Sequence, residues 1–425
     1  PVAGSAYTYA YATLGELFAW IIGWDLVLEY AVGSATVATR WSGYFQNVLQ
    51  KIGIVLPQAI RESPWRYDAT AGAFVSTGSF LNLPAIVIVS IVTIILVKGI
   101  QESASFNSAM VMIKVAAVLF VIGVGVFFID PANWHPFAPY GWTGIQFFGK
   151  HIAGQTDPGG SPMGAMAGAA IIFFAYIGFD SVSTHTEEAR NPQRDVPIGI
   201  VASLVLCTVL YILVVAVLTG MVPYNQLDIN APVSRAFQQQ GIGWAEAIIA
   251  VAGVAGITSV MLVMMLSAPR VFLAMARDGL VPKSFFGDVH PKFRTPWRST
   301  ILIGCFVIVM AGFLPIDALL HLTNIGTLFA FVVVCAAVLI MRKRYPDHPR
   351  PFRCPMVPLV PILGVLTCLL LMFSLPTANW WRLFAWLGLG LLIYFLYGRH
   401  HSVLTRPSSA AHMAGKPKVE PVAGG

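Results

Sequence analysis

Ten apolar runs, each close to the length that crosses a lipid bilayer, constrain this chain more than any other feature. A spanning helix needs about 20 mostly apolar residues, and its backbone amides must be hydrogen-bonded without water, which leaves helices as the solution for such runs. We therefore predict an all-α polytopic membrane protein with about ten transmembrane helices. The predicted spans are residues 15–37, 82–100, 108–129, 164–185, 197–221, 244–268, 299–315, 321–341, 357–375 and 379–397.

The composition agrees with a membrane protein and excludes an ordinary soluble domain. Of the 425 residues, 57% are hydrophobic and 11% are charged, whereas soluble domains carry about 25% charged residues. We predict a single membrane domain over residues 1–400. Residues 401–425 are polar, small and Pro-containing, so we predict a disordered cytoplasmic tail there.

The basic residues predict the orientation of the chain. With the N-terminus inside, 18 of the 26 Lys and Arg residues fall in inner loops and the tail, and seven fall outside. Lys and Arg are retained on the cytoplasmic side, so we predict a multi-pass protein of the cell membrane with both termini in the cytoplasm. The net charge of +7 is then explained by topology, and a nucleic-acid partner is not expected.

No pattern in the sequence indicates catalysis, a metal or a cofactor. The five cysteines include no CxxC pair, so neither a disulfide framework nor a metal site is expected. The sequence also lacks the GxSxG, HExxH and phosphate-loop motifs. We therefore predict that the protein is not an enzyme.

Ionisable residues inside the predicted spans point to function, because each costs at least a few kcal/mol at mid-membrane. Asp25 and Glu29 are four residues apart and share a helix face. They serve function, or one of them pairs with a basic group to hold helices together. Lys114 either snorkels to the interface along its stem or stays in the core, where it titrates or replaces a metal ion.

The predicted span 164–185 contains a glycine and a carboxylate, Gly178 and Asp180, among aromatic residues. Transporters interrupt helices near the midplane and use the freed backbone groups as ligands. Glycine lowers the cost of such a break. We therefore expect this span to be unwound near Gly178.

Three stretches resemble the amino acid–polyamine–organocation superfamily of permeases, in its bacterial cationic amino acid transporter-like branch. They are AGSAYTYAYATLGELFAWIIGWDLVLEYAVG, YIGFDS followed by EEARNPQRDVPIGI, and PRVFLAMARDGLVPKSFFGDVHPKFRTPWRSTI. The resemblance covers nearly the whole chain except the tail. It implies a LeuT-type fold of two inverted five-helix repeats and secondary active transport of amino acids.

The resemblance also implies the residues that bind the substrate. The backbone carbonyls of Phe174, Ala175 and Ile177, beside Gly178, would bind the α-ammonium group, and Phe174 would cap the site. Met264 matches a position that faces the substrate side chain. The branch takes cationic amino acids such as Arg and Lys, whereas a bulky Met264 would shorten the pocket and favour small neutral ones such as Ala.

Proton coupling is implied by three further matches. Lys114 matches a lysine that, in sodium-independent members, lies where others bind sodium. Glu29 and Asp180 match acidic positions of the branch, and Glu29 is expected to neutralise either Lys114 or the substrate. The expected partners are thus an amino acid, protons and the lipid bilayer, with a small single-span membrane subunit as a further candidate.

One departure from the family concerns the start of the chain. Members usually have twelve spans, and the Gly-rich break of the first binds the substrate carboxylate. The ten spans here begin where the third would begin, so we expect the first two to be absent. The alternatives to a permease are an inactive truncated transporter and a non-transporting membrane sensor; Glu29, Lys114 and Asp180 argue against the sensor.

Overall fold

The computed structural model describes residues 7–8, 10–11, 14–68, 73–99, 104–158, 160–179, 191–227, 231–347 and 353–403. Asp180 and the tail from residue 404 onward, both subjects of predictions above, lie outside these residues.

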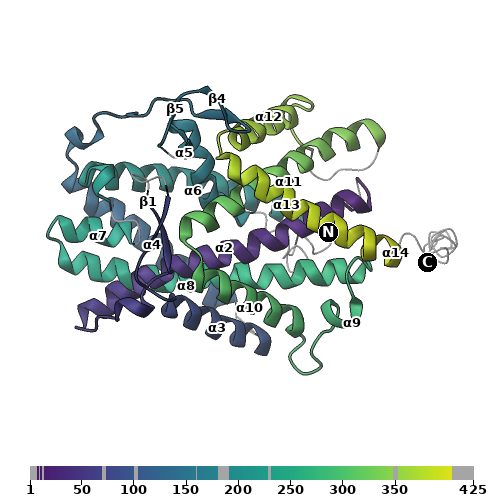
Figure 1. The fold of residues 1–425 in the computed structure, drawn as a ribbon, viewed down its shortest axis with the longest axis horizontal. Coiled ribbons are helices and arrows are strands. Elements are labelled where there is room, and N and C mark those ends of the chain that lie inside the picture. The colour runs from purple at the N-terminus through teal and green to yellow at the C-terminus, as the bar shows by residue number, and fades with distance from the viewer. Residues whose placement is uncertain are drawn as a thin grey trace, which may run out of the picture.

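The long helices lie side by side in one bundle, with α2 running through its middle (Figure 1). The helices are α2 (Glu16–Lys51), α3 (Leu83–Lys98), α4 (Ala104–Gly125), α5 (Ala165–Ile172), α6 (Pro192–Met221), α7 (Pro232–Gln239), α8 (Gly243–Arg277), α9 (Lys283–Phe286), α10 (Trp297–Phe313), α11 (Ile316–Arg344), α12 (Leu359–Phe373), α13 (Thr377–Ile393) and α14 (Arg399–His401).

An apolar helix overlaps each of the ten predicted spans, and these helices are of two kinds. Among the described residues, six segments are long and apolar enough to cross a membrane, and they lie in α2, α4, α6, α8, α11 and α13. Four apolar helices are shorter: α3, α10, α12 and the segment Ala165–Tyr176 that contains α5. Length and composition therefore support six spans directly and leave the other four as shorter apolar helices.

The first predicted span ends much earlier than the helix. Residues 15–37 were expected, whereas α2 continues to Lys51. Its second half contains Arg40, Gln46 and Asn47, which no simple apolar pattern would include. Asn47 is nevertheless buried and donates to Ser234 Oγ of α7 at 3.0 Å. Polar contacts with neighbouring helices thus stabilise the extension.

Short hairpins interrupt the helical architecture in two connections. Strands β1 (Trp65–Asp68) and β2 (Ala73–Ser76) pair antiparallel, with Trp65 opposite Ser76. The later connection holds two more antiparallel pairs, β3 (Ile145–Phe147) with β4 (Lys150–Ala153) and β5 (Gln155–Thr156) with β6 (Pro162–Met163). The all-α prediction described the spans and did not include these loop strands.

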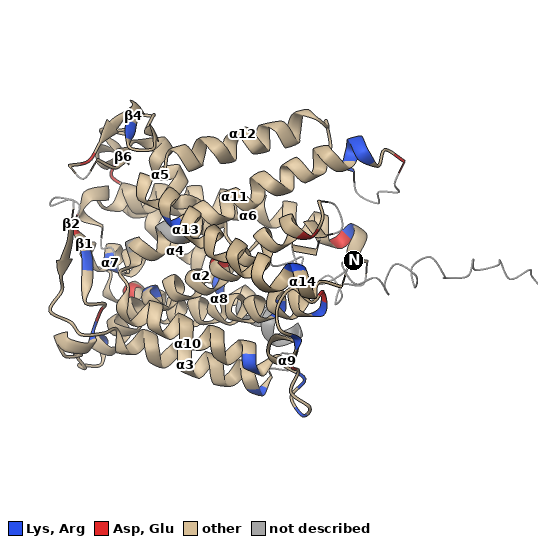
Figure 2. Cartoon of the chain, turned by 45° about the vertical axis from the view of Figure 1, so that its right-hand side comes forward, with Lys and Arg blue, Asp and Glu red and all other residues tan. Residues whose placement is uncertain are grey.

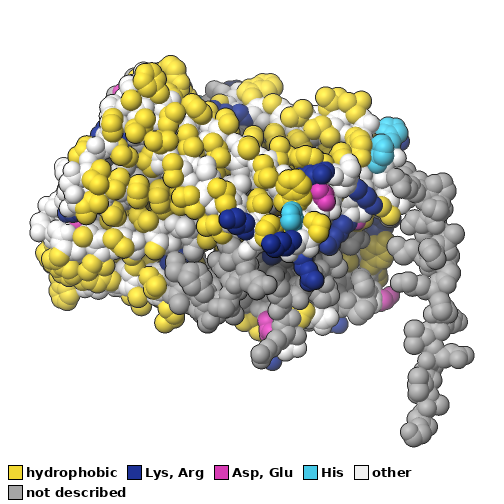
Figure 3. All heavy atoms as spheres, turned by 90° about the horizontal axis from the view of Figure 1, so that it is seen from below, with side chains coloured by type: hydrophobic (Ala, Val, Ile, Leu, Met, Phe, Trp, Pro, Cys, Tyr) yellow, Lys and Arg dark blue, Asp and Glu magenta, His cyan; other side chains and the backbone are white. Residues whose placement is uncertain are grey.

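The core forms around α2, which packs most extensively on α8 and also contacts α3, α10, α11 and α13. Charged residues lie mainly toward the two ends of the bundle, and few lie in its middle (Figure 2). Apolar side chains cover much of the face formed by α3 and α10, with basic side chains toward one end (Figure 3). Exposed side chains on this face include Val87, Ile91, Ile94, Leu302 and Val309. This distribution suits a surface that contacts lipid.

Candidate functional site

The helix that begins at Ala165 ends where the sequence predicted unwinding, and residues 173–178 that follow it are called the break. Its α-helical part ends at Ile172, and Phe173–Tyr176 form a 3₁₀ turn, η4. Ile177 is extended with ψ of 135°, and Gly178 has φ of 106°. L-residues rarely adopt that φ. A Cβ at Gly178 would meet nothing within 4 Å, so the backbone conformation, and not crowding, requires glycine.

Two of the three carbonyl groups predicted to bind substrate, those of Phe174 and Ala175, accept hydrogen bonds within the protein. The carbonyl of Phe174 accepts a hydrogen bond from the Ile177 N–H at 3.1 Å. The carbonyl of Ala175 accepts one from the Tyr211 O–H of α6 at 2.9 Å. A carbonyl oxygen has two lone pairs, so each can accept one further donor. Binding of a substrate ammonium group by these carbonyls remains a prediction.

A residue that sequence reasoning missed holds the helix just before the break. Asn324 of α11 donates through Nδ2 to the carbonyls of Ala170 at 3.1 Å and Ile171 at 2.8 Å. Asn324 is fully buried. Its signal was the polar pair Thr323-Asn324 within the predicted span 321–341, a neutral pair that the reasoning from charges and motifs did not single out.

Aromatic side chains of α11 and α6 also pack against the break. Phe331 of α11 contacts the rings of Phe173 and Phe179, with centroid distances of 5.9 Å and 5.3 Å. Tyr176 packs edge-on against Tyr211 of α6 at 5.5 Å. The unwound segment is therefore fixed on both sides, by α11 and by α6.

The two carboxylates of α2 lie in the centre of the bundle. Asp25 is 1% exposed and Glu29 is 2% exposed. Among the described residues, neither carboxylate oxygen of Asp25 has a hydrogen-bond partner. A Cβ at Gly326 of α11 would overlap that carboxylate, so the two helices approach closely here. The alternative that Asp25 holds helices together through an ion pair has no support in this part of the chain.

Lys114 of α4 faces α8. Its ammonium group donates to Ser259 Oγ, and its stem lies along Gly256, with Cγ 3.4 Å from where a Cβ would be. The preceding residues Val111, Met112 and Ile113 are exposed. Lys114 is thus on the inward side of α4, which favours a core role over snorkelling.

Met264 of α8 is 6% exposed and packs against α2. Its Cε occupies the space next to Gly33, where a Cβ would overlap it. Met264 is therefore a bulky side chain set between the two most central helices. Its contact with a substrate remains a prediction.

Comparison with known proteins places this arrangement in a family. Residues 1–395 match the family described as amino acid permease. The chain belongs to the amino acid permease family. It is 43% identical to the methylthioribose transporter of Bacillus subtilis over 96% of this chain and 82% of that protein. It is 44% identical, with the same coverage, to the branched-chain amino acid permease of the same organism. It is 35% identical to cationic amino acid transporter 4 of Arabidopsis thaliana over 82% of this chain and 54% of that protein.

The family confirms the resemblance that the three sequence motifs indicated. This permease is a multi-pass membrane transporter of the amino acid–polyamine–organocation type and not an enzyme, since the family and its relatives are transporters. The family description implies an amino acid as the substrate.

In the permease, α11 connects the two groups of predicted site residues. The break carries Phe174, Ala175, Ile177 and Gly178 and packs on α6 and α11. Asp25, Glu29, Lys114 and Met264 belong to the α2, α4 and α8 group. Helix α11 contacts α2, α5 and η4. It therefore contacts both the break and the helix that carries the buried carboxylates.

Proposed function

We propose that this permease carries neutral amino acids with branched side chains across the cell membrane by alternating access, coupled to protons. The observation that carries the proposal is the break at residues 173–178, fixed by α6 and α11. Carbonyls released from a helix can bind an ammonium group at the midplane of a transporter. Because all α-amino acids share that group, the break would bind the substrate class and leave side-chain selection to other residues.

Two findings favour a neutral side chain. Met264 is bulky and buried against Gly33, which leaves less room for a guanidinium than a small residue would. A branched-chain amino acid permease is 44% identical to this chain, compared with 35% for a cationic amino acid transporter. A methylthioribose transporter is as similar, at 43%, so methylthioribose is the second candidate substrate.

Proton coupling would use the ionisable residues of the bundle. The Lys114 ammonium, held by Ser259 of α8, would exchange a proton during the cycle. Glu29 would neutralise Lys114 or the substrate, and Asp180 would be the third proton-coupling group. A buried charge is costly unless compensated, so a change in protonation would favour one conformation of the transporter over the other.

The orientation follows from the basic residues. With 18 of the 26 on the cytoplasmic side, both termini would lie in the cytoplasm. Residues 1–400 would form the membrane domain and residues 401–425 a disordered tail. A small single-span subunit stays a prediction, for which the lipid-facing helices offer apolar surface.

Uptake by proteoliposomes tests the proposal. We expect leucine, isoleucine and valine to accumulate under an inward proton gradient, and arginine and methylthioribose to remain near background. Lys114→Ala should keep leucine binding but lose the dependence on the proton gradient. Unchanged proton dependence in Lys114→Ala would refute the role of Lys114, and accumulation of methylthioribose alone would select the second substrate.

Met264→Ser tests the basis of side-chain selection. The smaller side chain should allow arginine uptake and weaken that of leucine, because it removes bulk next to Gly33. Met264→Leu, which keeps the volume, is the matched control and should retain leucine uptake. If Met264→Ser and the parent protein have the same substrate preference, Met264 does not face the substrate.

A further inference from the structure

A polar pocket lies apart from the interrupted helix, at the end of the bundle where α2 ends. Its volume is about 480 Å³, within the range of small-molecule sites. It is formed by the second half of α2, the segment 61–67, and the starts of α3, α7 and α11. None of its lining residues belongs to α5 or η4. In the proposed orientation, this pocket opens on the outer side of the membrane.

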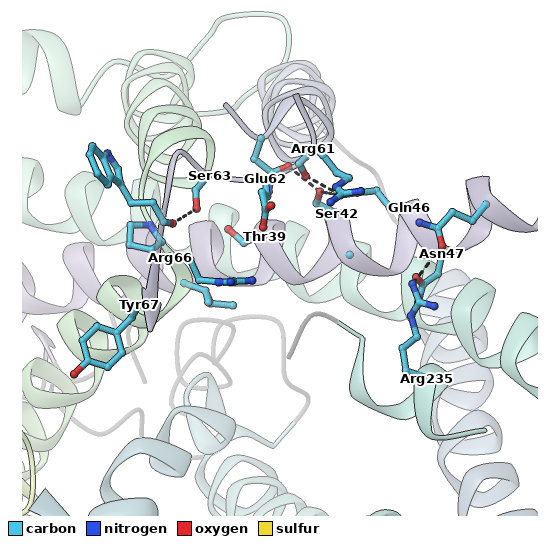
Figure 4. A pocket seen from close by; sticks show the side chains of 16 residues that line it. Thr39, Ser42, Gln46, Asn47, Arg61, Glu62, Ser63, Arg66, Tyr67 and Arg235 are labelled. Atoms are coloured by element: carbon cyan, nitrogen blue, oxygen red, sulfur yellow. Dashed lines mark hydrogen bonds between the residues drawn. The ribbon is translucent and has the colours of Figure 1, made fainter. Parts of the chain in front are cut away.

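Hydrogen bonds fix the wall of the pocket to α2. Gln46 Nε2 donates to the carbonyl of Arg61 at 2.8 Å and to Ser42 Oγ at 3.0 Å. Ser42 Oγ in turn donates to Asn82 Oδ1 at 2.7 Å, and both residues are buried. The segment that carries Arg61 is thus held in place before any ligand binds (Figure 4).

The charged residues of this wall are mostly positive. Three arginines and one glutamate line the pocket, namely Arg61, Arg66, Arg235 and Glu62. In Figure 4, Arg66 extends from β1 toward α2. A cavity lined by one sign of charge attracts the opposite charge and repels its own.

Two of these charged residues already have partners. Arg235 donates through its two terminal nitrogens to Gln238 Oε1 at 2.7 Å and Gln50 Oε1 at 3.2 Å. Glu62 accepts a hydrogen bond from Gln58 Nε2 at 3.0 Å. Glu62 keeps further acceptor capacity, because an ionised carboxylate has about four lone-pair sites.

The side chains of Arg61 and Arg66 differ from that of Arg235. Within the part of the chain that the structure describes, neither guanidinium has a hydrogen bond or an ion pair. A guanidinium presents a planar fork that matches a carboxylate with two parallel hydrogen bonds. Two such groups on one pocket wall are therefore available to an anionic ligand.

We propose that this pocket is an entry site, in which Arg61 and Arg66 bind the carboxylate of an amino acid and Glu62 receives its ammonium group. The site selects neutral over cationic amino acids before the substrate reaches the interrupted helix, because a second positive charge would face the remaining arginine of the pocket, Arg235. The inference rests on the proposed function, since it concerns the same substrate class.

A labelling experiment tests the entry site without relying on transport. Thr39 of α2 lines the pocket, and the Thr39→Cys variant in lipid nanodiscs would be reacted with a neutral maleimide. Leucine should slow labelling, whereas leucinol, which lacks the carboxylate, and arginine should have little effect. The protein with Thr39 unchanged measures the background from the five native cysteines.

Substitutions in the Thr39→Cys background identify the groups that bind. Arg61→Gln or Arg66→Gln should weaken protection by leucine about 10- to 100-fold, as expected for a lost charge-assisted hydrogen bond. Arg235→Gln removes the same charge from a guanidinium that is already engaged, so it should change protection by less than about threefold. Thermal unfolding of each variant shows whether it remains folded, and Arg66→Lys supplies a milder substitution.

The outcomes separate this inference from the proposed function. Equal protection by leucine and leucinol, or equal effects of Arg66→Gln and Arg235→Gln, would overturn the entry site. Absence of protection together with normal leucine uptake would overturn it as well, while leaving the proposed transport intact. Carboxylate-dependent protection in a protein that takes up no amino acid would support the site and refute the transport function.

Discussion

Helices α2 and α6 are both long enough to cross a membrane, yet their surroundings are opposite. Within an apolar 18-residue window of each helix, 78% of the α2 residues are buried, whereas 6% of the α6 residues are. Helix α2 carries Asp25 and Glu29 in the core. Helix α6 exposes apolar side chains such as Val205, Leu206 and Ile212.

The difference shows that these two helices reverse the pattern of soluble proteins: the helix with ionisable groups in its middle is buried, and the more apolar helix is exposed. Lipid is as apolar as leucine, so apolar side chains gain little by leaving it. Ionisable and polar groups are placed inside the bundle. The central helix therefore carries carboxylates in its buried part, whereas the carboxylate of the outer helix, Asp195, is exposed in its first turn. Changes inside the bundle should cost more than changes facing lipid.

The largest effect is expected where α2 meets α11. Gly326→Ala would place a Cβ on the Asp25 carboxylate, and overpacking at a buried site costs about 1–3 kcal/mol or more. Displacing a buried carboxylate adds to that cost. We expect little folded protein, measured as the monodisperse fraction in detergent and as a lower unfolding temperature.

Two variants control for this effect. Gly388→Ala on α13 adds the same methyl group where nothing lies within 4 Å, and it should be neutral or slightly stabilising. Gly326→Ala combined with Asp25→Ala should recover part of the folded yield. Equal behaviour of Gly326→Ala and Gly388→Ala would show that the approach of α2 and α11 is not tight.

A smaller effect is expected from the two side chains that bind the carbonyls near the break. Asn324→Leu removes two hydrogen bonds in a fully buried place, which should cost about 2 kcal/mol. Tyr211→Phe removes one bond from the outer helix α6 and should cost about 1 kcal/mol or less. The KM for leucine uptake should rise about 30-fold in the first variant and a few-fold in the second.

Comparing the change in KM with the change in unfolding temperature shows what that result means. If Asn324 positions the substrate site, KM should rise more than the unfolding temperature predicts, and Asn324→Gln should restore part of it. A fall in stability with an unchanged KM would make Asn324 a purely structural residue. A larger effect of Tyr211→Phe than of Asn324→Leu would contradict the ranking of inner over outer helices.

Sequence reasoning predicted the features that depend on local pattern. Apolar runs located the helices, and the combination of Gly178 with aromatic neighbours located the break. Sequence reasoning could not predict the second half of α2, because Asn47 and Ser42 are stabilised there by partners on α7 and at the start of α3. Those partners are distant in sequence, and polarity alone argued for a loop.

The missed parts of the site have the same physical cause. Asn324 matters through carbonyls about 150 residues away in the chain, a separation that no periodicity reveals. The arginine-lined pocket gathers Arg61 and Arg66 with Arg235 of α7, and the sequence counted these only as outer-loop charge. Single ionisable residues within the spans could be identified from the sequence, whereas groups of residues contributed by different helices could not.

The break itself gives a third test, in which glycine is replaced by alanine at two positions with different backbone conformations. Gly178→Ala must place an L-residue at φ of 106°, which costs about 1–2 kcal/mol. Uptake should fall about 5- to 30-fold. Gly168→Ala in α5, where a Cβ also meets nothing within 4 Å, should keep uptake and stabilise slightly. Loss of uptake in both would point to packing and against the backbone conformation.

The smallest effect is expected at the end of α8, the main partner of α2, where Asp278 accepts a hydrogen bond from the Tyr7 O–H at 2.6 Å. Burial raises the pKa of Asp278 above its ordinary value, and the hydrogen bond from Tyr7 and the charge of Lys283 offset this only in part. The folded state therefore binds the proton more readily than the unfolded state. The resulting stability is present below the unfolded pKa and is lost as pH rises through the folded pKa.

Asp278→Asn removes this dependence while its Oδ1 can still accept from Tyr7. At neutral pH the variant should unfold at a slightly higher temperature than the parent protein, and the difference should vanish toward about pH 4. Unfolding temperatures of both proteins across that range measure the effect, since all other titrating groups are shared. A variant that is less stable at neutral pH would mean that the ionised carboxylate gains more from Tyr7 and Lys283 than burial costs. The packed end of α8 would then tolerate charge as well as the exposed end of a helix such as α6.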